Sequence, residues 1–250
     1  MIDFPGRGLL LDVEGTTTSI SFVYETLFPY ARQKLRAFLQ EHATDPEVIE
    51  ASLAIVRETG AASLAEFQRQ RLEPNALEKE VLRRMDADDK STGLKQLQGL
   101  IWRAGYERGE LRGHVYPDVP VAFKAWAAQG ADIRIYSSGS VEAQRLLFSH
   151  STAGSLESYL RGHYDTRIGG KRSAESYGRI VNDIGREASA VLFFSDVVEE
   201  LDAAREAGLA TVLVRRADEQ TPPPGPARAR SSASPSSHPV INQFAEVRLI

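Results

Sequence analysis

Short, almost continuously apolar runs alternate with helix-like segments along most of the chain. Residues 8–13 and 190–195 are the strongest of these runs, and such unbroken apolar stretches are typical of strands that are buried on both faces of a parallel sheet. Weaker runs predict further strands at residues 131–136, 166–168 and 210–214.

Between these runs, apolar residues recur at the helical period of three to four residues. They predict helices at residues 121–129, 141–148, 173–184 and 198–207, and Gly130 is a typical stop signal for the first of them. Strands that alternate with helices of this length form a doubly wound α/β fold, in which helices cover both faces of a parallel sheet. We therefore expect this fold for most of the chain.

Residues 22–111 follow a different pattern. Leu27, Ala31, Leu35 and Phe38 recur at helical spacing, and the stretch has almost no alternation of β-branched and polar residues. This pattern predicts an all-helical insertion.

The predicted organisation is an α/β catalytic core made of residues 1–20 and 113–250, interrupted by a helical cap at 21–112. Residues 221–239 are rich in Pro, Ser, Ala and Arg and contain no large apolar side chain, so we expect a mobile loop without a function. Residues 240–250 regain an apolar pattern and are expected to return to the core as a strand or a helix.

Polar residues follow the three strongest strand candidates. Asp12, Ser137 and Asp196 all stand at or just beyond the carboxyl end of a predicted strand. Ligands of doubly wound sheets bind at this edge. We expect these three side chains to lie close together although they are far apart in the sequence.

Four separated features resemble the four motifs of the haloacid dehalogenase superfamily of phosphatases. They are the run DVEGT that begins at Asp12, the run YSSGS that ends at Ser140, Lys171 at the start of a helix, and the pair Ser195-Asp196. Each is weak alone, because a strand-terminal Asp is often a turn residue, serine-rich loops are common, and lysine is usually solvated. Their joint occurrence in this order implies a phosphatase in which Asp12 is the covalent phosphoryl acceptor.

The residue two positions after Asp12 makes the resemblance more specific. The superfamily usually has a second Asp there, whereas this chain has Glu14. The run DVEGTTTSISFVYETLFPYA resembles the acireductone synthases, the bifunctional enolase-phosphatases of methionine salvage, and so do HVYPDVP, IYSSGS, GGKRSAESYGRI and FFSDVVEELDAAREAG. The resemblance implies a substrate, 2,3-diketo-5-methylthiopentyl 1-phosphate, which is enolised and then dephosphorylated to the acireductone 1,2-dihydroxy-3-keto-5-methylthiopentene.

The same resemblance implies the roles of the site residues. A carboxylate that attacks a phosphate ester needs its charge masked, and one Mg²⁺ per subunit, held by Asp12 and Asp196, does this. The family adds the main-chain carbonyl of Glu14 as a third ligand, which leaves the Glu14 carboxyl to act as general acid and base. The predicted phosphate ligands are Ser137, Ser138 and Lys171. The acids Glu199 and Glu200 could orient ligands, but we expect them on a solvated helix face.

Two alternatives stay open at this point. One is a phosphatase of the same superfamily that acts on another small phosphate ester without enolase activity. The other is a binding module that keeps the fold without turnover, which the presence of all four motifs disfavours. The enolisation base is also open; Glu14 is the nearest candidate in role.

Composition narrows the partners and the compartment. The formal net charge is −4 and basic residues are scattered among acids, so we expect no nucleic-acid or membrane partner. The chain has no cysteine, and its start, MIDFPGRG, lacks the features of a secretory signal. We therefore expect a cytoplasmic protein, and a monomer because no helix has an obvious spare apolar face.

Overall fold

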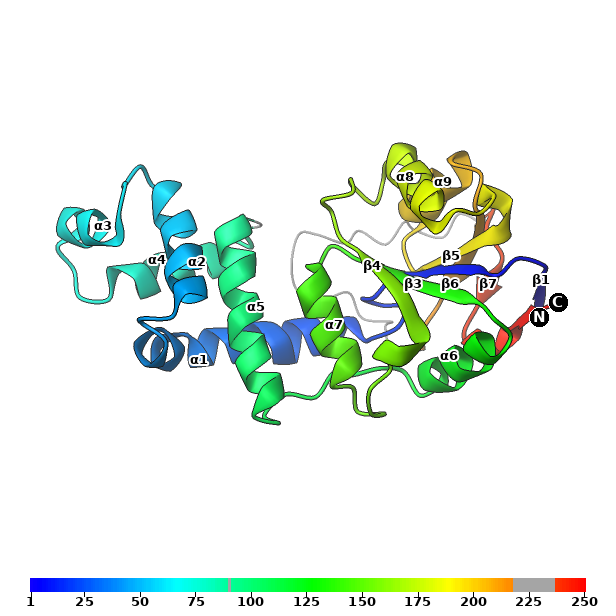
Figure 1. Cartoon of the computed structure of the whole chain (residues 1–250), viewed down its shortest axis with the longest axis horizontal. Helices are drawn as coiled ribbons and strands as arrows, with labels where there is room; N and C mark the ends of the chain where they lie inside the picture. The colour runs from blue at the N-terminus through cyan, green and yellow to red at the C-terminus, as the bar shows by residue number, and fades with distance from the viewer. Residues whose placement is uncertain (90, 218–236) are drawn as a thin grey trace. The chain divides into compact units, whose positions relative to one another are not determined.

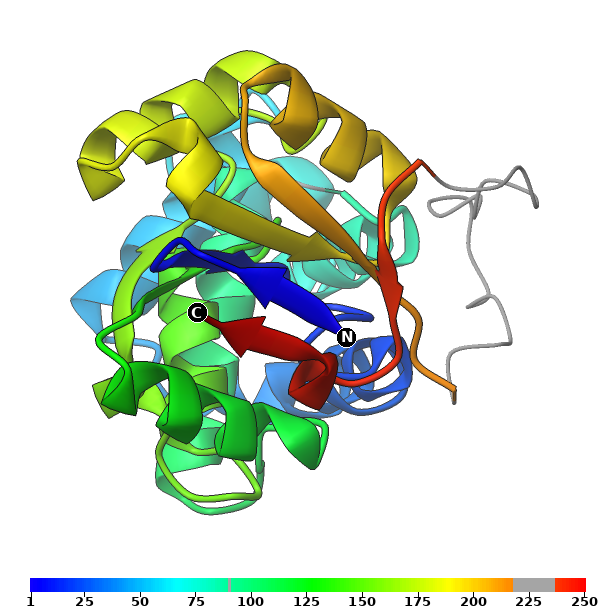
Figure 2. The ribbon, with the colours of Figure 1, turned by 90° about the vertical axis from the view of Figure 1, so that its right-hand side faces the viewer.

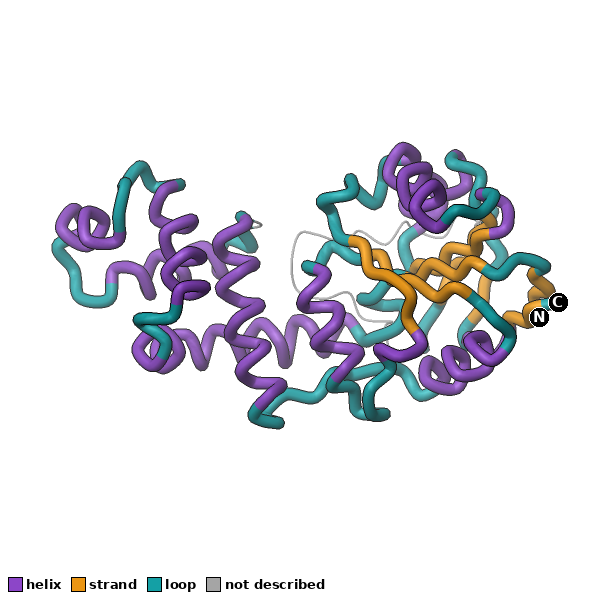
Figure 3. Tube along the Cα trace, viewed as in Figure 1, coloured by secondary structure: helices purple, strands orange, loops and turns teal. Residues whose placement is uncertain are grey.

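The computed structural model describes residues 1–89, 91–217 and 237–250. The chain divides into two compact units, one made of Met1–Tyr24 with Arg112–Ile250 and the other of Glu25–Leu111. We call them the α/β unit and the helical unit (Figure 1). Among the described residues, all named strands belong to the α/β unit, as Figure 3 shows.

A six-stranded parallel sheet forms the centre of the α/β unit. Its strands run in the order β4-β3-β2-β5-β6-β7. Their bounds are Gly8–Leu11 (β2), Asp132–Tyr136 (β3), Leu160–Tyr164 (β4), Val191–Ser195 (β5), Ala210–Val214 (β6) and Val240–Ile241 (β7). The chain adds β3 and β4 on one side of β2 and the later strands on the other, so the carboxyl end of β2 lies at the switch point where such sheets bind ligands.

Helices cover both faces of this sheet. They are α6 (Asp118–Ala128), α7 (Val141–Ser149), α8 (Ala174–Ile184) and α9 (Val198–Glu206), with short 3₁₀ turns at Glu157–Tyr159, Ala188–Ala190 and Phe244–Glu246. Figure 2 shows α8 and α9 on one face and α6 on the other. On the α6 face, the ring of Trp126 packs 5.6 Å from that of Phe194 and 5.4 Å from that of Phe244. The predicted doubly wound fold is confirmed.

The two ends of the chain pair with each other. Strand β1 (Ile2–Phe4) runs parallel to β8 (Val247–Leu249) in a separate two-stranded sheet, visible beside the marked termini in Figure 2. The predicted return of residues 240–250 to the core thus takes the form of two short strands, β7 and β8, around a 3₁₀ turn. The loop expected at 221–239 lies outside the described residues up to position 236.

The strand predicted at residues 166–168 is wrong. The fourth strand of the sheet is β4, which ends at Tyr164, and residues 166–168 form a turn in which the Asp165 carboxylate accepts the N–H of Arg167 at 2.9 Å. The sequence of β4, LRGHY, mixes apolar, polar and glycine residues because this strand is at the edge of the sheet. It therefore lacks the unbroken apolar run that marks a central strand.

The π-helix η1 (Phe22–Leu27) starts in the α/β unit and continues into the helical unit. The described residues of the helical unit also form five α-helices. These are α1 (Phe28–Glu41), α2 (Pro46–Arg57), α3 (Leu64–Arg71), α4 (Ala76–Asp86) and α5 (Thr92–Glu107). Leu35, Ile55, Val81 and Leu97 are buried in one apolar cluster that joins α1, α2, α4 and α5. No helix among the described residues is both long enough and apolar enough to span a membrane.

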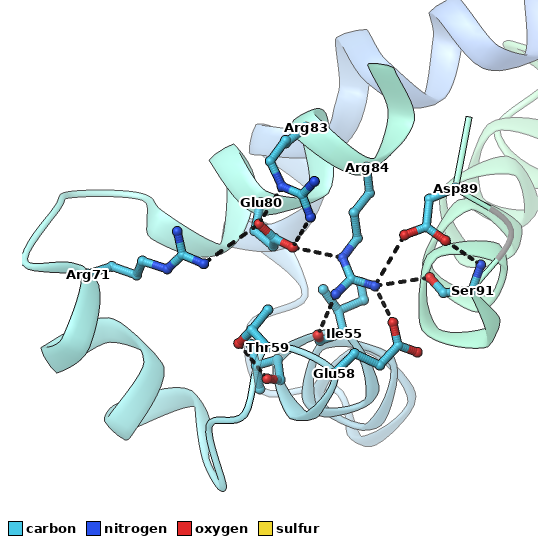
Figure 4. A network of polar contacts seen from close by, with 10 residues as sticks. Ile55, Glu58, Thr59, Arg71, Glu80, Arg83, Arg84, Asp89 and Ser91 are labelled. Carbon is cyan, nitrogen blue, oxygen red and sulfur yellow. Dashed lines mark hydrogen bonds and ion pairs between the residues drawn. The ribbon is translucent and has the colours of Figure 1, made fainter. Parts of the chain in front are cut away.

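A buried arginine fixes the interior of the helical unit (Figure 4). The Arg84 side chain is 4% exposed; its Nε donates to Glu80 Oε1 at 2.9 Å and its Nη2 to the Ile55 carbonyl at 3.1 Å. Its Nη1 contacts Glu58 and Ser91 Oγ. A buried guanidinium needs such partners to offset its lost hydration. The network thereby connects α2, α4 and the start of α5.

Candidate active site

Asp12 lies at the carboxyl end of the central strand β2. Its N–H continues the pairing with β5 by donating to the Phe194 carbonyl at 2.9 Å, and its side chain is buried. The chain then turns back on itself, because the Val13 carbonyl accepts the N–H groups of Thr17 and Thr18, both at 2.9 Å. We call residues 13–18 the nucleophile turn, after the role predicted for Asp12.

Lys171 meets Asp12 from the loop that precedes α8. Its Nζ lies 2.5 Å from Asp12 Oδ1 and 2.6 Å from Glu200 Oε2. The Lys171 carbonyl accepts the hydroxyl of Tyr177 at 2.7 Å, and the Tyr136 ring centroid is 5.9 Å from Nζ. Two carboxylates and the ring of Tyr136 thus hold the ammonium, and Tyr177 holds the main chain of the same residue.

Burial and charge act in opposite directions on this cluster. Burial by itself lowers the pKa of Lys171, but the neighbouring Asp12 and Glu200 outweigh burial and hold that pKa above its ordinary value. Burial raises the pKa of the Glu200 carboxyl, although Lys171 opposes the rise. Lys171 therefore stays charged throughout the pH range in which proteins normally work.

Asp196 reaches the nucleophile turn from the end of β5. It is buried, and a Cβ atom added to Gly15 would lie 2.5 Å from its Oδ2. Gly15 also has a φ of +77°, which favours glycine. Glu14, half-buried, is the preceding residue of the same turn and forms a β-bridge with Thr18. The turn that follows Asp12 thus lies against Asp196 at Gly15, the residue next to Glu14.

The oxygen atoms of Asp12, Asp196 and the nucleophile turn fit a magnesium ion. Asp12 Oδ2 is buried and has no hydrogen-bond partner among the described residues, which is costly for a carboxylate oxygen unless a cation or its water satisfies it. The described residues contain no group of three or more His, Cys, Asp or Glu side chains that could hold a metal. Two carboxylates and a main-chain carbonyl need no such group, and oxygen atoms are the ligands that Mg²⁺ prefers.

The serine loop follows β3, the neighbour of β2. Ser137 is buried and its N–H donates to the Tyr164 carbonyl at 3.1 Å, whereas Ser138 is exposed. Ser137 Oγ accepts the N–H of Gly139 at 3.1 Å, and Ser140 Oγ caps α7 by accepting the N–H of Ala143. The loop thus leads into a helix N-terminus, which favours anions.

The two acids that follow Asp196, Glu199 and Glu200, differ in their burial. Glu199 is exposed, as expected, but the expectation of a solvated position for Glu200 is wrong: it is buried, and its Oε2 accepts the Ser195 hydroxyl at 2.9 Å. The helical period contained the signal, because Glu200 stands four residues before the buried Ala204 on the inner side of α9.

The comparisons with known proteins agree with this architecture. A model of the haloacid dehalogenase-like hydrolases matches residues 7–208. An enolase-phosphatase E1 of Stenotrophomonas maltophilia (strain K279a) is 46% identical over 244 residues, which are 97% of this chain and 99% of that protein. An enolase-phosphatase E1 of Pseudomonas aeruginosa (strain UCBPP-PA14) is 43% identical over 241 residues, 96% of this chain and 97% of that protein.

Among solved structures, the UTR4 protein of Saccharomyces cerevisiae is similar with a TM-score of 0.73 and 34% identity, and the match covers 96% of this chain and 98% of that one. The chain belongs to the enolase-phosphatase E1 family of haloacid dehalogenase-like hydrolases. This is the family that the motifs around Asp12, Lys171 and Asp196 indicated.

Proposed function

We propose that the protein is a Mg²⁺-dependent enolase-phosphatase of methionine salvage. It converts 2,3-diketo-5-methylthiopentyl 1-phosphate to the acireductone 1,2-dihydroxy-3-keto-5-methylthiopentene and phosphate. One observation carries the proposal: a buried Asp12 carboxylate, bonded to Lys171 and set at the end of the central strand, in a chain 46% identical to an enolase-phosphatase E1.

The phosphatase steps use Asp12 and Glu14. Asp12 Oδ1 attacks the phosphorus atom, the ester P–O bond breaks, and its electron pair leaves on the substrate oxygen, which takes a proton from the Glu14 carboxyl. Glu14 then removes a proton from water, the water oxygen attacks phosphorus, and the bond between Asp12 and phosphorus breaks. The products are free phosphate and regenerated Asp12.

Three side chains bind the phosphoryl group during these steps. Lys171 balances the negative charge on Asp12 before the attack and on the phosphoryl oxygens afterwards. Ser137 and Ser138 donate their hydroxyl protons to the same oxygens. The bond between Ser137 Oγ and the Gly139 N–H supports this role, because it occupies an acceptor position of the hydroxyl and leaves the proton to donate.

Asp12, the main-chain carbonyl of Glu14, and Asp196 would hold one Mg²⁺ per subunit. When bound, the ion masks the negative charge of the attacking carboxylate and of the phosphoryl oxygens. For the enolisation, Glu14 is the proposed base, because it is the single acid of the nucleophile turn, is half-buried, and has a side chain one methylene longer than that of Asp.

The alternative is a phosphatase for another small phosphate ester without enolase activity. A time course with the diketone phosphate separates the two, since enolisation precedes dephosphorylation. We expect an enol absorbance that rises before or together with free phosphate. Equal phosphate release from unrelated esters, without an enol signal, would favour the alternative.

Asp12→Asn provides the matched control for this experiment. The amide keeps the size of the carboxylate but cannot form the acyl phosphate, so we expect no phosphate release and an unchanged circular dichroism spectrum. Activity in this variant would remove Asp12 from the mechanism.

We further propose a cytoplasmic monomer. The absence of cysteine supports a reducing compartment. Light scattering after gel filtration measures the mass of the assembly, and a dimer would contradict the proposed state.

A further inference from the structure

Arg216 is a buried cation at the end of β6 that the motifs did not reveal. Its side chain is 4% exposed. Its Nε and Nη2 donate to the Thr16 carbonyl at 3.0 and 2.7 Å, and its Nη1 lies 2.9 Å from both carboxylate oxygens of Asp118. The guanidinium therefore ties the nucleophile turn to the first residue of α6.

Two aromatic rings enclose the same guanidinium. Arg216 Cζ lies 4.3 Å from the ring centroid of Tyr116 and 4.6 Å from that of Phe244. Asp118 Oδ2 also accepts the N–H of Phe244 at 2.7 Å, and Arg216 Nη1 donates to the Asn242 carbonyl at 3.1 Å. Three segments that are distant from one another in the sequence meet at this one side chain.

The contact with Thr16 matters because of where Thr16 stands. Thr16 is fully buried, follows Gly15, which packs against Asp196, and is two residues after Glu14. A buried carbonyl without a donor costs about 1–3 kcal/mol, so the nucleophile turn would rearrange if the guanidinium were lost. The planar fork of arginine donates to Thr16 from Nε and Nη2 and to Asp118 from Nη1, whereas the shorter side chain of lysine has one nitrogen for all of these bonds.

We propose that Arg216 is a positioning residue of the phosphatase site. The effect that we expect on turnover rests on the proposed function. It holds the main chain at Thr16, and thereby keeps the Glu14 carboxyl and carbonyl in place beside Asp12. It touches neither the substrate nor the reacting atoms.

The test compares Arg216→Lys with Arg215→Lys, a matched control at the neighbouring half-buried position, where the main-chain N–H bonds to Ile241. In Arg216→Lys we expect kcat to fall about 10- to 100-fold while KM changes less than about threefold, because misplaced catalytic groups slow chemistry more than binding. Hydrogen exchange of the Thr17 and Thr18 amides should become about 10-fold faster. Arg215→Lys should leave all three quantities unchanged.

Asp118→Asn gives a second route to the same turn. It should produce the same pattern, and the double variant should lose little more than either single one, because both changes break one network. A lower melting temperature with unchanged kcat and unchanged amide exchange in Arg216→Lys would overturn the proposal and leave a purely structural role.

Failure of the proposed function is distinguishable from failure of this inference. If the wild-type protein releases no phosphate from the diketone phosphate, amide exchange and calorimetric binding of Mg²⁺ still test Arg216. Faster exchange at Thr17 and weaker Mg²⁺ binding in Arg216→Lys support the positioning role, and wild-type values of both contradict it.

Discussion

Glu200 Oε2 lies 2.6 Å from Lys171 Nζ inside the α/β unit, where the two side chains are 9% and 7% exposed. The pair places a second carboxylate behind the ammonium that contacts Asp12. Because Ser195 holds the same oxygen of Glu200, Lys171 has little freedom to turn away from Asp12.

Glu200→Gln should therefore lower kcat without abolishing it. The amide keeps the volume of the side chain but loses a charge-assisted hydrogen bond of about 1.5–3 kcal/mol, which corresponds to roughly 10- to 100-fold in rate. Steady-state kinetics with the diketone phosphate measures the change. Glu199→Gln, one position earlier on the exposed side of α9, should stay within about twofold of the wild type. Equal losses in the two variants would show that the contact with Lys171 is not responsible.

Gly15 offers a test of how closely the nucleophile turn must approach Asp196. Gly15→Ala adds a methyl group that would lie 2.5 Å from Asp196 Oδ2, so we expect loss of most activity and of Mg²⁺ binding. Gly185→Ala is the matched control, because Gly185 also has a positive φ, +69°, but nothing lies within 4 Å of its added Cβ. Both variants should lose about 1–2 kcal/mol of stability from backbone strain. Full activity in Gly15→Ala would refute the tight contact.

Mg²⁺ should stabilise the folded protein because the buried Asp12 Oδ2 gains a partner only when the ion binds. At a free concentration about 100 times Kd, the expected gain is about 2.7 kcal/mol, or roughly 5–10 °C in melting temperature. Thermal melts with and without a chelator measure this shift. Asp196→Asn should remove it, whereas Glu199→Gln should retain it. A shift of full size in Asp196→Asn would exclude Asp196 as a ligand.

The sequence predicted the central part of the site because the central strands carry the clearest pattern. The runs that became β2 and β5 are buried on both faces, so their ends, and with them Asp12 and Asp196, could be assigned without a structure. Strand β4 was placed too late in the chain, since an edge strand with mixed polarity has no such run.

Buried charges were harder to predict, since their partners are distant in the sequence. Glu200 looked like a surface acid because its burial depends on Lys171, which arrives from another element. Arg216 bonds to Thr16, 200 residues earlier, and to Asp118, 98 residues earlier. Periodicity can place Glu200 on the inner side of α9, but it does not identify the partners of these buried charges, whose segments the sheet topology brings together.

The lowered pKa of Glu80, in the helical unit, should make the free energy of unfolding depend on pH. Hydrogen bonds from Arg83, and then from Arg84, outweigh burial and lower its pKa from 4.5 to about 2. The folded state thus binds this proton more weakly than the unfolded state. The stabilisation is fully present above pH 4.5 and is lost as the pH falls towards 2, up to about 3 kcal/mol in total.

Urea unfolding of the wild type and of Glu80→Gln, followed by circular dichroism between pH 7 and pH 2.5, checks this prediction. The variant should be less stable at pH 7, and the difference should shrink as the pH falls because the wild type loses the charge that the variant already lacks. Glu73→Gln, which removes an exposed partner of Lys79, should follow the wild-type curve. A constant difference between the wild type and Glu80→Gln at every pH would mean that packing at Glu80, rather than its charge, stabilises the network around Arg84.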